Sequence, residues 1–96
     1  MSTPKSTVVT DAPERSRYEI SVDGALAGFA VYRLAPGRII FVHTEIDDAY
    51  EGQGLGGQLA RAALDDVRAR GLAMRPDCPF IAGWIAKHPD YATLVA

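Results

Sequence analysis

The sequence predicts an α/β fold with a mixed, mainly antiparallel sheet of about four strands and two helices, in the order βββαβα. Three observations predict this fold. Residues 17–46 contain alternating apolar runs separated by turn dipeptides, the apolar spacing becomes helical from Gly54, and a short β-prone segment with a second helical segment follows Gly71. A chain of 96 residues can bury one modest core, so one domain is expected over residues 17–96.

Two turn signals divide the first part of this domain into a meander of three antiparallel strands. Asp23-Gly24 is a hairpin turn dipeptide, and Pro36-Gly37 marks a second turn. The expected strands cover residues 18–22, 25–34 and 38–46. Residues 1–16 are rich in Ser, Thr and Pro without periodicity, so we expect them to form a flexible N-terminal tail.

The second part of the domain is expected to contain a helix, a strand and a second helix. Gly71 is the expected stop of the first helix, residues 72–75 are the expected strand, and the second helix is expected from Pro79 to about Lys87. The small and apolar residues that share one face of the first helix are Gly56, Leu59, Ala60, Ala63, Leu64 and Val67.

Composition excludes several classes of function. Apolar residues make up 48% and charged residues 23%, which is the balance of a soluble globular protein, and a net charge of -2 argues against nucleic-acid binding. The single cysteine excludes an internal disulfide and a cysteine-rich zinc site. No apolar run is long enough for a membrane span, and the first residues lack a signal-peptide core, so a cytoplasmic protein is expected.

The glycine-rich segment Gly52–Gly57 lies between a strand and an amphipathic helix. Helix N-termini have free N–H donors and partial positive charge, and glycines let an anion approach the backbone closely. A phosphate site is therefore predicted, with a simple capping loop as the alternative. The segment also fits G-x-G-x-x-G, but a dinucleotide fold is rejected because a hairpin meander precedes it and too little chain remains. A nucleotide-binding P-loop is excluded because no Gly-Lys-Ser/Thr ends the segment.

The segments so far resemble the central core of the GNAT superfamily of N-acetyltransferases. Glu51–Gly56 matches the acetyl-CoA signature Arg/Gln-x-x-Gly-x-Gly/Ala except at Glu51. His43–Ile46, Asp77–Phe80 and His88–Tyr91 closely resemble the small YjdJ-like subgroup. The resemblance covers residues 18–95 and implies a minimal GNAT-like core that transfers acetyl from acetyl-CoA to an amine.

The resemblance also implies which residues bind acetyl-CoA. The strand edge at Thr44 and Ile46 is expected to contact pantetheine. The pyrophosphate is expected on the backbone of Gln53, Gly54, Leu55, Gly56 and Gly57. Expected partners are acetyl-CoA and a small-molecule or protein amine, with no metal, nucleic acid or membrane, and the chain is expected to be a monomer or weak homodimer.

Acyl transfer to an amine needs a base, an oxyanion stabiliser and a proton for the leaving thiolate. His43 and Glu45 are candidate catalytic residues because they end the strand nearest the glycine segment. Strand alternation predicts that both share the face of Ile39 and Phe41. The alternative makes His43 an ordinary sheet residue and Glu45 a solvated strand end.

Cys78 and Tyr91 are further candidates. Cys78 precedes Pro79, so its sulfur is expected near a helix N-terminus, where a thiol pKa is lowered; the alternative is a small buried apolar residue. Tyr91 carries a phenol that can act as a general acid. Phe80 and Trp84 recur at helical spacing and are assigned to the core.

The predicted activity is acetyl transfer by direct attack of the amine on the thioester, since the resemblance implies that both substrates are held together. Two other functions are kept as alternatives. One is a non-catalytic acyl-CoA-binding module that uses the same glycine segment, and the other is an interaction domain in which that segment is empty.

Overall fold

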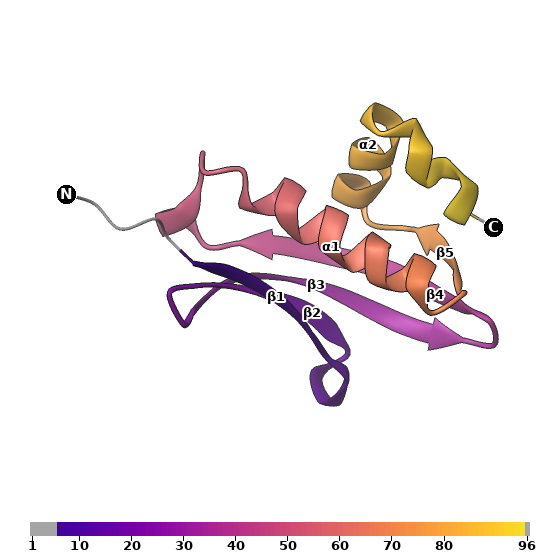
Figure 1. Cartoon of the computed structure of the whole chain (residues 1–96), viewed down its shortest axis with the longest axis horizontal. Helices are drawn as coiled ribbons and strands as arrows, with labels where there is room; N and C mark the ends of the chain where they lie inside the picture. The colour runs from indigo at the N-terminus through magenta and orange to yellow at the C-terminus, as the bar shows by residue number, and fades with distance from the viewer. Residues whose placement is uncertain (1–5, 96) are drawn as a thin grey trace.

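A five-stranded sheet and two α-helices on one of its faces make up the computed structural model, which describes residues 6–95 (Figure 1). The strands are β1 (Thr7–Ala12), β2 (Arg17–Val22), β3 (Ala25–Ala35), β4 (Arg38–Ile46) and β5 (Ala73–Pro76). The helices are α1 (Leu55–Ala69) and α2 (Pro79–Lys87), with 3₁₀ helices η1 (Pro13–Arg15), η2 (Asp48–Tyr50) and η3 (Pro89–Leu94).

The strands follow one another across the sheet in chain order. Each neighbouring pair from β1 to β4 is antiparallel, and β5 runs parallel to β4 after the crossover through α1. Asp23 and Gly24 both adopt positive φ, which is the backbone of a tight hairpin turn between β2 and β3. The predicted hairpin, meander and mixed sheet are confirmed.

The sheet has one strand more than predicted. Strand β1 is made from residues 7–12, which we expected within the flexible tail, and it pairs with β2 along its whole length. Its β-branched residues Thr7, Val8 and Val9 favour a strand, and the Thr7 hydroxyl donates to Gln58 of α1 at 3.0 Å. Long-range pairing therefore overrides the local Ser, Thr and Pro bias. The rest of the expected tail, residues 1–5, lies outside the described residues.

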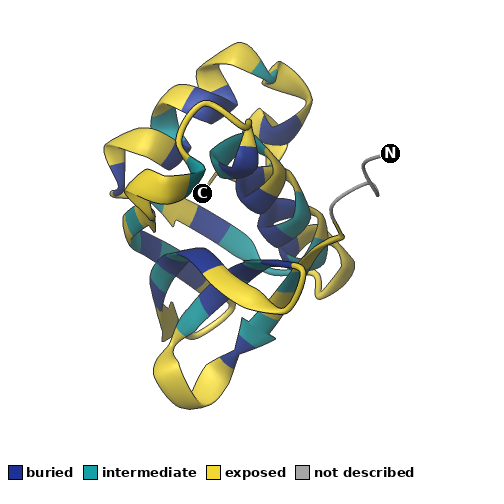
Figure 2. Ribbon diagram, turned by 90° about the vertical axis from the view of Figure 1, so that its left-hand side faces the viewer, coloured by how far each residue is buried: buried dark blue, intermediate teal, exposed yellow. Residues whose placement is uncertain are grey.

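Helices α1 and α2 both cover the same face of the sheet, and the core lies between the two layers (Figure 2). Helix α1 begins after Gly54 and ends before Gly71, whose positive φ stops it as predicted. Its predicted apolar face is buried except at Gly56, which is half-buried. The largest fully buried side chains are Tyr18, Ile20, Ile39, Phe41, Leu59, Leu64, Val67, Met74 and Ile81.

Two buried tyrosines link the N-terminal strands, one to α1 and the other across the sheet. The hydroxyl of Tyr18 donates to Asp66 of α1 at 2.6 Å, and that of Tyr32 donates to Asp11 of β1 at 2.6 Å. Burial, with the hydrogen bond to Asp11, raises the pKa of Tyr32 to about 12. Burial likewise raises the pKa of Tyr18, so both phenols stay neutral donors at neutral pH. Arg70 completes the cluster by donating to Tyr18 and Asp11.

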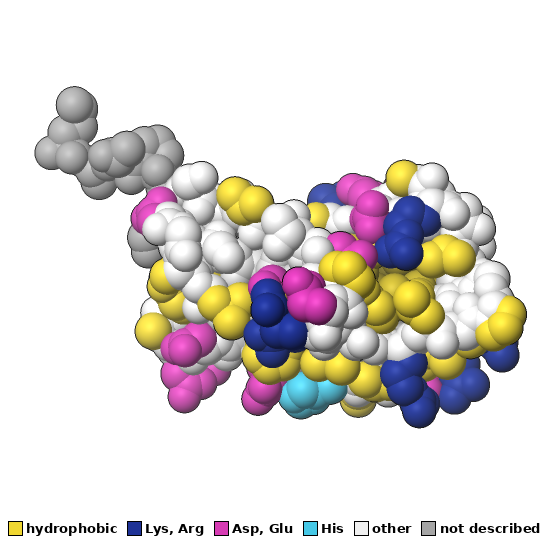
Figure 3. Space-filling model, turned by 90° about the horizontal axis from the view of Figure 1, so that it is seen from below, with side chains coloured by type: hydrophobic (Ala, Val, Ile, Leu, Met, Phe, Trp, Pro, Cys, Tyr) yellow, Lys and Arg dark blue, Asp and Glu magenta, His cyan; other side chains and the backbone are white. Residues whose placement is uncertain are grey.

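No helix of the described residues covers the opposite face of the sheet. Figure 3 shows apolar side chains gathered there between charged ones. Phe29, Val31 and Ile40 are half-buried on this face, and the guanidinium of Arg17 lies 4.3 Å from the centre of the Phe29 ring. Hydrogen bonds from Arg15 and Arg17 lower the pKa of Glu19 to about 2. Long cationic side chains thus cover part of the apolar surface that no helix covers.

Candidate active site

The start of α1 is an open anion cradle. Gly52 and Gly54 adopt positive φ, and a Cβ at either would meet no atom within 4 Å, so the backbone is exposed there. Gly54 accepts the first helical hydrogen bond, from the N–H of Gln58. The N–H groups of residues 55–57 therefore have no acceptor within the helix, and no side chain caps this end. An anion can bind these donors.

Strand β4 is paired with β5 along only half of its length. The parallel pairing runs from Arg38 opposite Ala73 to Phe41 opposite Pro76, and the N–H of Cys78 then donates to the carbonyl of Phe41 at 2.9 Å. Beyond that bond the chain turns into α2. Within the described residues, no strand pairs with this edge of β4 over residues 42–46. This open edge can hydrogen-bond an extended ligand with amide groups.

A β-bulge interrupts β4 at the point where β5 ends. Between Phe41 and His43 the register with β3 shifts by one residue, so Val42 is an extra residue in β4. A side chain that follows such a bulge lies on the other face from the one that strict alternation predicts. The bulge therefore decides which residues of the strand end face the helices.

The predicted orientation of His43 and Glu45 is wrong for this reason. After the bulge, Thr44 and Ile46 are the residues on the helix side, where Ile46 packs against the buried cluster. His43 and Glu45 lie on the opposite face, away from Phe41, and each side chain is 59% exposed. Their polar ends remain together, with 3.6 Å between His43 Nε2 and Glu45 Oε2.

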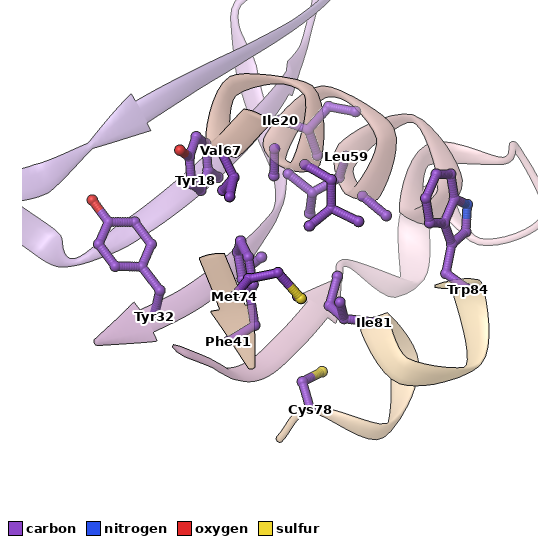
Figure 4. Close-up of a cluster of buried hydrophobic side chains, with 14 of the residues drawn as sticks. Tyr18, Ile20, Tyr32, Phe41, Leu59, Val67, Met74, Cys78, Ile81 and Trp84 are labelled. Carbon is purple, nitrogen blue, oxygen red and sulfur yellow. The ribbon is translucent and has the colours of Figure 1, made fainter. Parts of the chain in front are cut away.

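Cys78 lies two residues after the end of β5, and its backbone carbonyl accepts the first hydrogen bond of α2, from the N–H of Ala82. Its sulfur is buried and lies 3.3 Å from the Thr44 hydroxyl. Figure 4 shows it at the margin of the core, near Ile81. The expected position at a helix N-terminus is confirmed, but the sulfur faces Thr44 rather than His43 or Glu45. The contact joins β4 and α2 at the end of the open strand edge.

One hollow lies on each side of the end of β4, and Ile46 lines both of them. The first has a volume of about 360 Å³ and lies between the ends of β3 and β4, where Glu45, Asp47 and Asp48 contribute carboxylates. The second has a volume of about 290 Å³ and lies between the glycine segment and α2. Phe80 of α2 is part of its wall. One hollow is thus acidic and the other adjoins the anion cradle.

Tyr91 lies apart from this arrangement. Its hydroxyl donates to Asp65 of α1 at 2.6 Å, and its ring packs against Trp84 and under Arg68. None of these partners belongs to the glycine segment or to the contact between Thr44 and Cys78. The hydrogen bond to Asp65 and burial raise the pKa of the phenol, which makes it a weaker acid. These contacts hold η3 against the two helices, and a catalytic role for Tyr91 stays a prediction.

Phe80 lines the second hollow but was not among the predicted site residues. Its helical spacing with Trp84 predicted a core position, yet Phe80 is 43% exposed. Helix α2 has nine residues, and Ile81, Trp84 and Ile85 form its buried stripe. The position directly after a proline at the start of a helix was the available signal, because first-turn side chains lie at the helix end and not over its middle.

The two features form one candidate site. The uncapped N-terminus of α1 offers N–H donors to an anion, the open edge of β4 offers backbone groups to an extended ligand, and Ile46 of β4 lines the hollow beside the glycine segment. Among residues 6–95, no three metal-ligand side chains come together, and no helix has the length and apolarity needed to cross a membrane.

The fold and this site define the chain as a member of the GCN5-related N-acetyltransferase family, whose model matches residues 17–94. Among relatives, the chain is 31% identical over 78 residues to protein NATD1 of Mus musculus, covering 79% of this chain and 71% of that protein. It is 40% identical over 47 residues to NATD1 of Homo sapiens, covering 49% of this chain and 42% of that protein.

A solved structure shows the same fold. The chain matches the ribosomal-protein-alanine N-acetyltransferase of Brucella melitensis biovar Abortus 2308 with a TM-score of 0.58 and 18% identity. The match covers 83% of this chain but 60% of that one, so a large part of the solved protein has no counterpart here. The GNAT resemblance is thus confirmed, while membership of the YjdJ-like subgroup stays a prediction.

Proposed function

We propose that the protein transfers an acetyl group from acetyl-CoA to an amine by direct attack. The observation that carries this proposal is the junction of the uncapped start of α1 with the unpaired half of β4. One ligand with a pyrophosphate at one end and amides toward the other would use both features. Family membership supports the type of reaction, and this junction supports the position proposed for the ligand.

Acetyl-CoA as substrate would lie on the helix side of the sheet. The backbone from Gln53 to Gly57 would hold its pyrophosphate, and the edge at Thr44 and Ile46 would hold its pantetheine. The thioester would then come near the contact between Thr44 and Cys78. A thioester supplies an activated acyl group, and the residues around it exclude water and orient the carbonyl.

The amine would approach from the opposite face of the sheet. Because β5 ends at Pro76, the edge of β4 beyond the bulge is open to both faces, so donor and acceptor can meet there. The acidic hollow beside Glu45 would attract a protonated amine, and Glu45 together with His43 would take its proton. The acceptor is either a small molecule or a protein amine.

In the proposed step, the neutral amine nitrogen bonds to the thioester carbonyl carbon while the carbon–sulfur bond breaks. Glu45 and His43 pass the first ammonium proton to solvent before the attack. The second nitrogen proton then leaves to Glu45, and the departing thiolate takes up one proton from solvent. Cys78 has a supporting role in this scheme, because its sulfur is buried against Thr44 on the helix side. An acetyl group found on Cys78 at the rate of turnover would contradict direct attack.

A non-catalytic acyl-CoA-binding module is the second candidate. Glu51 lines the second hollow and places a carboxylate where the family signature has a donor, which favours weak binding without turnover. The third candidate, an interaction domain with an empty glycine segment, predicts no binding of acetyl-CoA at all.

Thiol release from acetyl-CoA with a panel of amines tests these alternatives. We expect release that depends on the amine, and a loss of roughly 100-fold in Glu45→Gln near neutral pH. That loss shrinks as pH rises, because more of the amine is then neutral without a base. Glu14→Gln in the distant η1 is the matched control and keeps full activity. Binding of acetyl-CoA without release for any amine would favour the non-catalytic module.

A further inference from the structure

Phe80 is an aromatic residue left 43% exposed on the first turn of α2. The other large apolar side chains of this helix, Ile81, Trp84 and Ile85, are buried. An exposed phenylalanine beside a hollow is informative, because the exposed part of its ring can still be buried by a bound apolar group.

Gly56 on α1 makes room for this ring. A Cβ at position 56 would lie 2.7 Å from Cζ of Phe80, which is closer than nonbonded carbon atoms approach. The ring is therefore in contact with the backbone at the start of α1. A side chain at position 56 would push the ring out of its place at the wall of the hollow.

The hollow next to this ring is apolar where it leaves the anion cradle. Its volume is about 290 Å³. The large apolar side chains in its wall are those of Ile46, Tyr50, Leu55 and Phe80, and Glu51 lines it as well. The same hollow is lined by the glycines that begin α1. A matching ligand has a phosphate group followed directly by a compact, branched apolar group.

Acyl-CoA has this chemistry. Its pantoyl unit carries a carbon with two methyl groups, separated from the pyrophosphate by one methylene. With the pyrophosphate at the start of α1 and the thioester toward Cys78, the pantoyl unit passes the first turn of α2. The order of groups along the ligand thus agrees with the order of features along the site.

We propose that Phe80 and Gly56 form a subsite for the dimethyl group of the pantoyl unit, closed on its other sides by Ile46 and Leu55. This inference rests on the proposed function, because it assumes the pyrophosphate on α1. The ring packs on the two methyl groups and fixes the course of the pantetheine arm toward the open edge of β4. Phe80 is then a residue that selects acyl-CoA over other nucleotides with a pyrophosphate.

Isothermal titration with CoA, and ligand-observed NMR with ADP, tests the subsite. ADP has a pyrophosphate but no pantoyl unit. We expect Phe80→Ala to weaken CoA binding roughly tenfold and Phe80→Leu to weaken it less, since leucine keeps an apolar contact. Binding of ADP changes by less than about twofold in both variants. The matched control is Leu34→Ala, which removes another exposed apolar side chain, at the far end of β3, and keeps wild-type affinity for both ligands.

A double-mutant cycle tests the contact with Gly56. Gly56→Ala alone is expected to weaken CoA binding by displacing the ring. Combined with Phe80→Ala, it adds little further loss, because the ring it would displace is gone.

The outcomes separate this inference from the proposed function. If the wild-type protein binds no CoA, the proposed function fails. If it binds CoA and Phe80→Ala, shown to be folded by circular dichroism, binds CoA equally well, the subsite is wrong and the proposed function stands. An equal loss for CoA and ADP would also overturn the subsite, since Phe80 would then support the anion cradle rather than the pantoyl unit.

Discussion

Glu51 places a carboxylate beside the anion cradle, where the family signature has arginine or glutamine. The side chain is exposed and lines the second hollow, with Asp47 and Asp48 close by in the chain. A bound pyrophosphate would be repelled by these charges, so the backbone donors of α1 must supply the attraction. This single residue is the strongest argument within the chain for weak acetyl-CoA binding.

Replacement of Glu51 by Gln should therefore tighten acetyl-CoA binding by roughly 0.5 to 2 kcal/mol, because a repulsive charge becomes a donor. Isothermal titration at low and high salt measures the effect, and the gain should shrink at high salt because screening already weakens the repulsion. Affinity that is unchanged or lower in Glu51→Gln would mean that the carboxylate points away from the ligand.

Glu19 gives a prediction about folding rather than function. Its carboxylate accepts hydrogen bonds from Arg15 and Arg17, which lower its pKa from 4.5 to about 2. A lowered pKa in the folded state stabilises the fold above the unfolded value of 4.5, and this stabilisation is lost as pH falls toward 2. We expect Glu19→Gln to lose roughly 0.5 to 1 kcal/mol of unfolding free energy at neutral pH.

Urea denaturation of wild type and Glu19→Gln at about pH 7 and about pH 2.5 checks this. The difference between the two proteins should narrow at the lower pH, because Glu19 is then protonated in the unfolded state and must release that proton on folding to pair with the arginines. A difference that is the same at both pH values would show that the carboxylate charge does not stabilise the fold.

At the scale of elements, α1 and the end of β4 determine the site. The position of α1 followed from the sequence, because six small or apolar residues repeat at helical spacing. Gly54 precedes the start of the helix, and Gly71 follows its end. The orientation of the β4 end did not follow from the sequence. The bulge at Val42 leaves no mark in the sequence, because the apolar run that begins at Ile39 continues through Val42 without a break, so alternation assigned His43 and Glu45 to the wrong face.

Gly54→Val tests the role of the loop between these elements. Valine resists the positive φ of Gly54, and its branched side chain would cover the donors at the start of α1. We expect a folded protein with no measurable acetyl-CoA binding, recorded by titration together with circular dichroism. Gly24→Val serves as the control, since it places the same strain in the distant turn between β2 and β3. A folded Gly54→Val variant that keeps its affinity would contradict the loop assignment.

At the scale of the whole molecule, the fold class could be predicted from the sequence, but the fifth strand and the uncovered sheet face could not. Strand β1 depends on pairing with β2 and on contact with α1, neither of which is local in sequence. The cavity beside Glu45 depends on where β3 and β4 end relative to each other. Such features depend on contacts between segments far apart in the sequence, and local residue patterns do not predict those contacts.

The two faces of the sheet differ in the chemical groups that they present. The helix side offers the anion cradle and the apolar hollow, and the open side offers Glu45 and the acidic hollow. They meet where β5 stops pairing with β4. The proposed function therefore requires that acetyl-CoA lies along the unpaired half of β4 and that its pyrophosphate binds at the start of α1.

Titration of the isotopically labelled protein with acetyl-CoA, followed by amide NMR shifts, tests that claim most directly. We predict the largest shifts at the amides of residues 43–46 and 53–57 and at the ring of Phe80, with Leu34 at the far end of β3 unchanged. Shifts confined to the opposite face around Val31 and Ile40, or no shifts at saturating acetyl-CoA, would contradict the account.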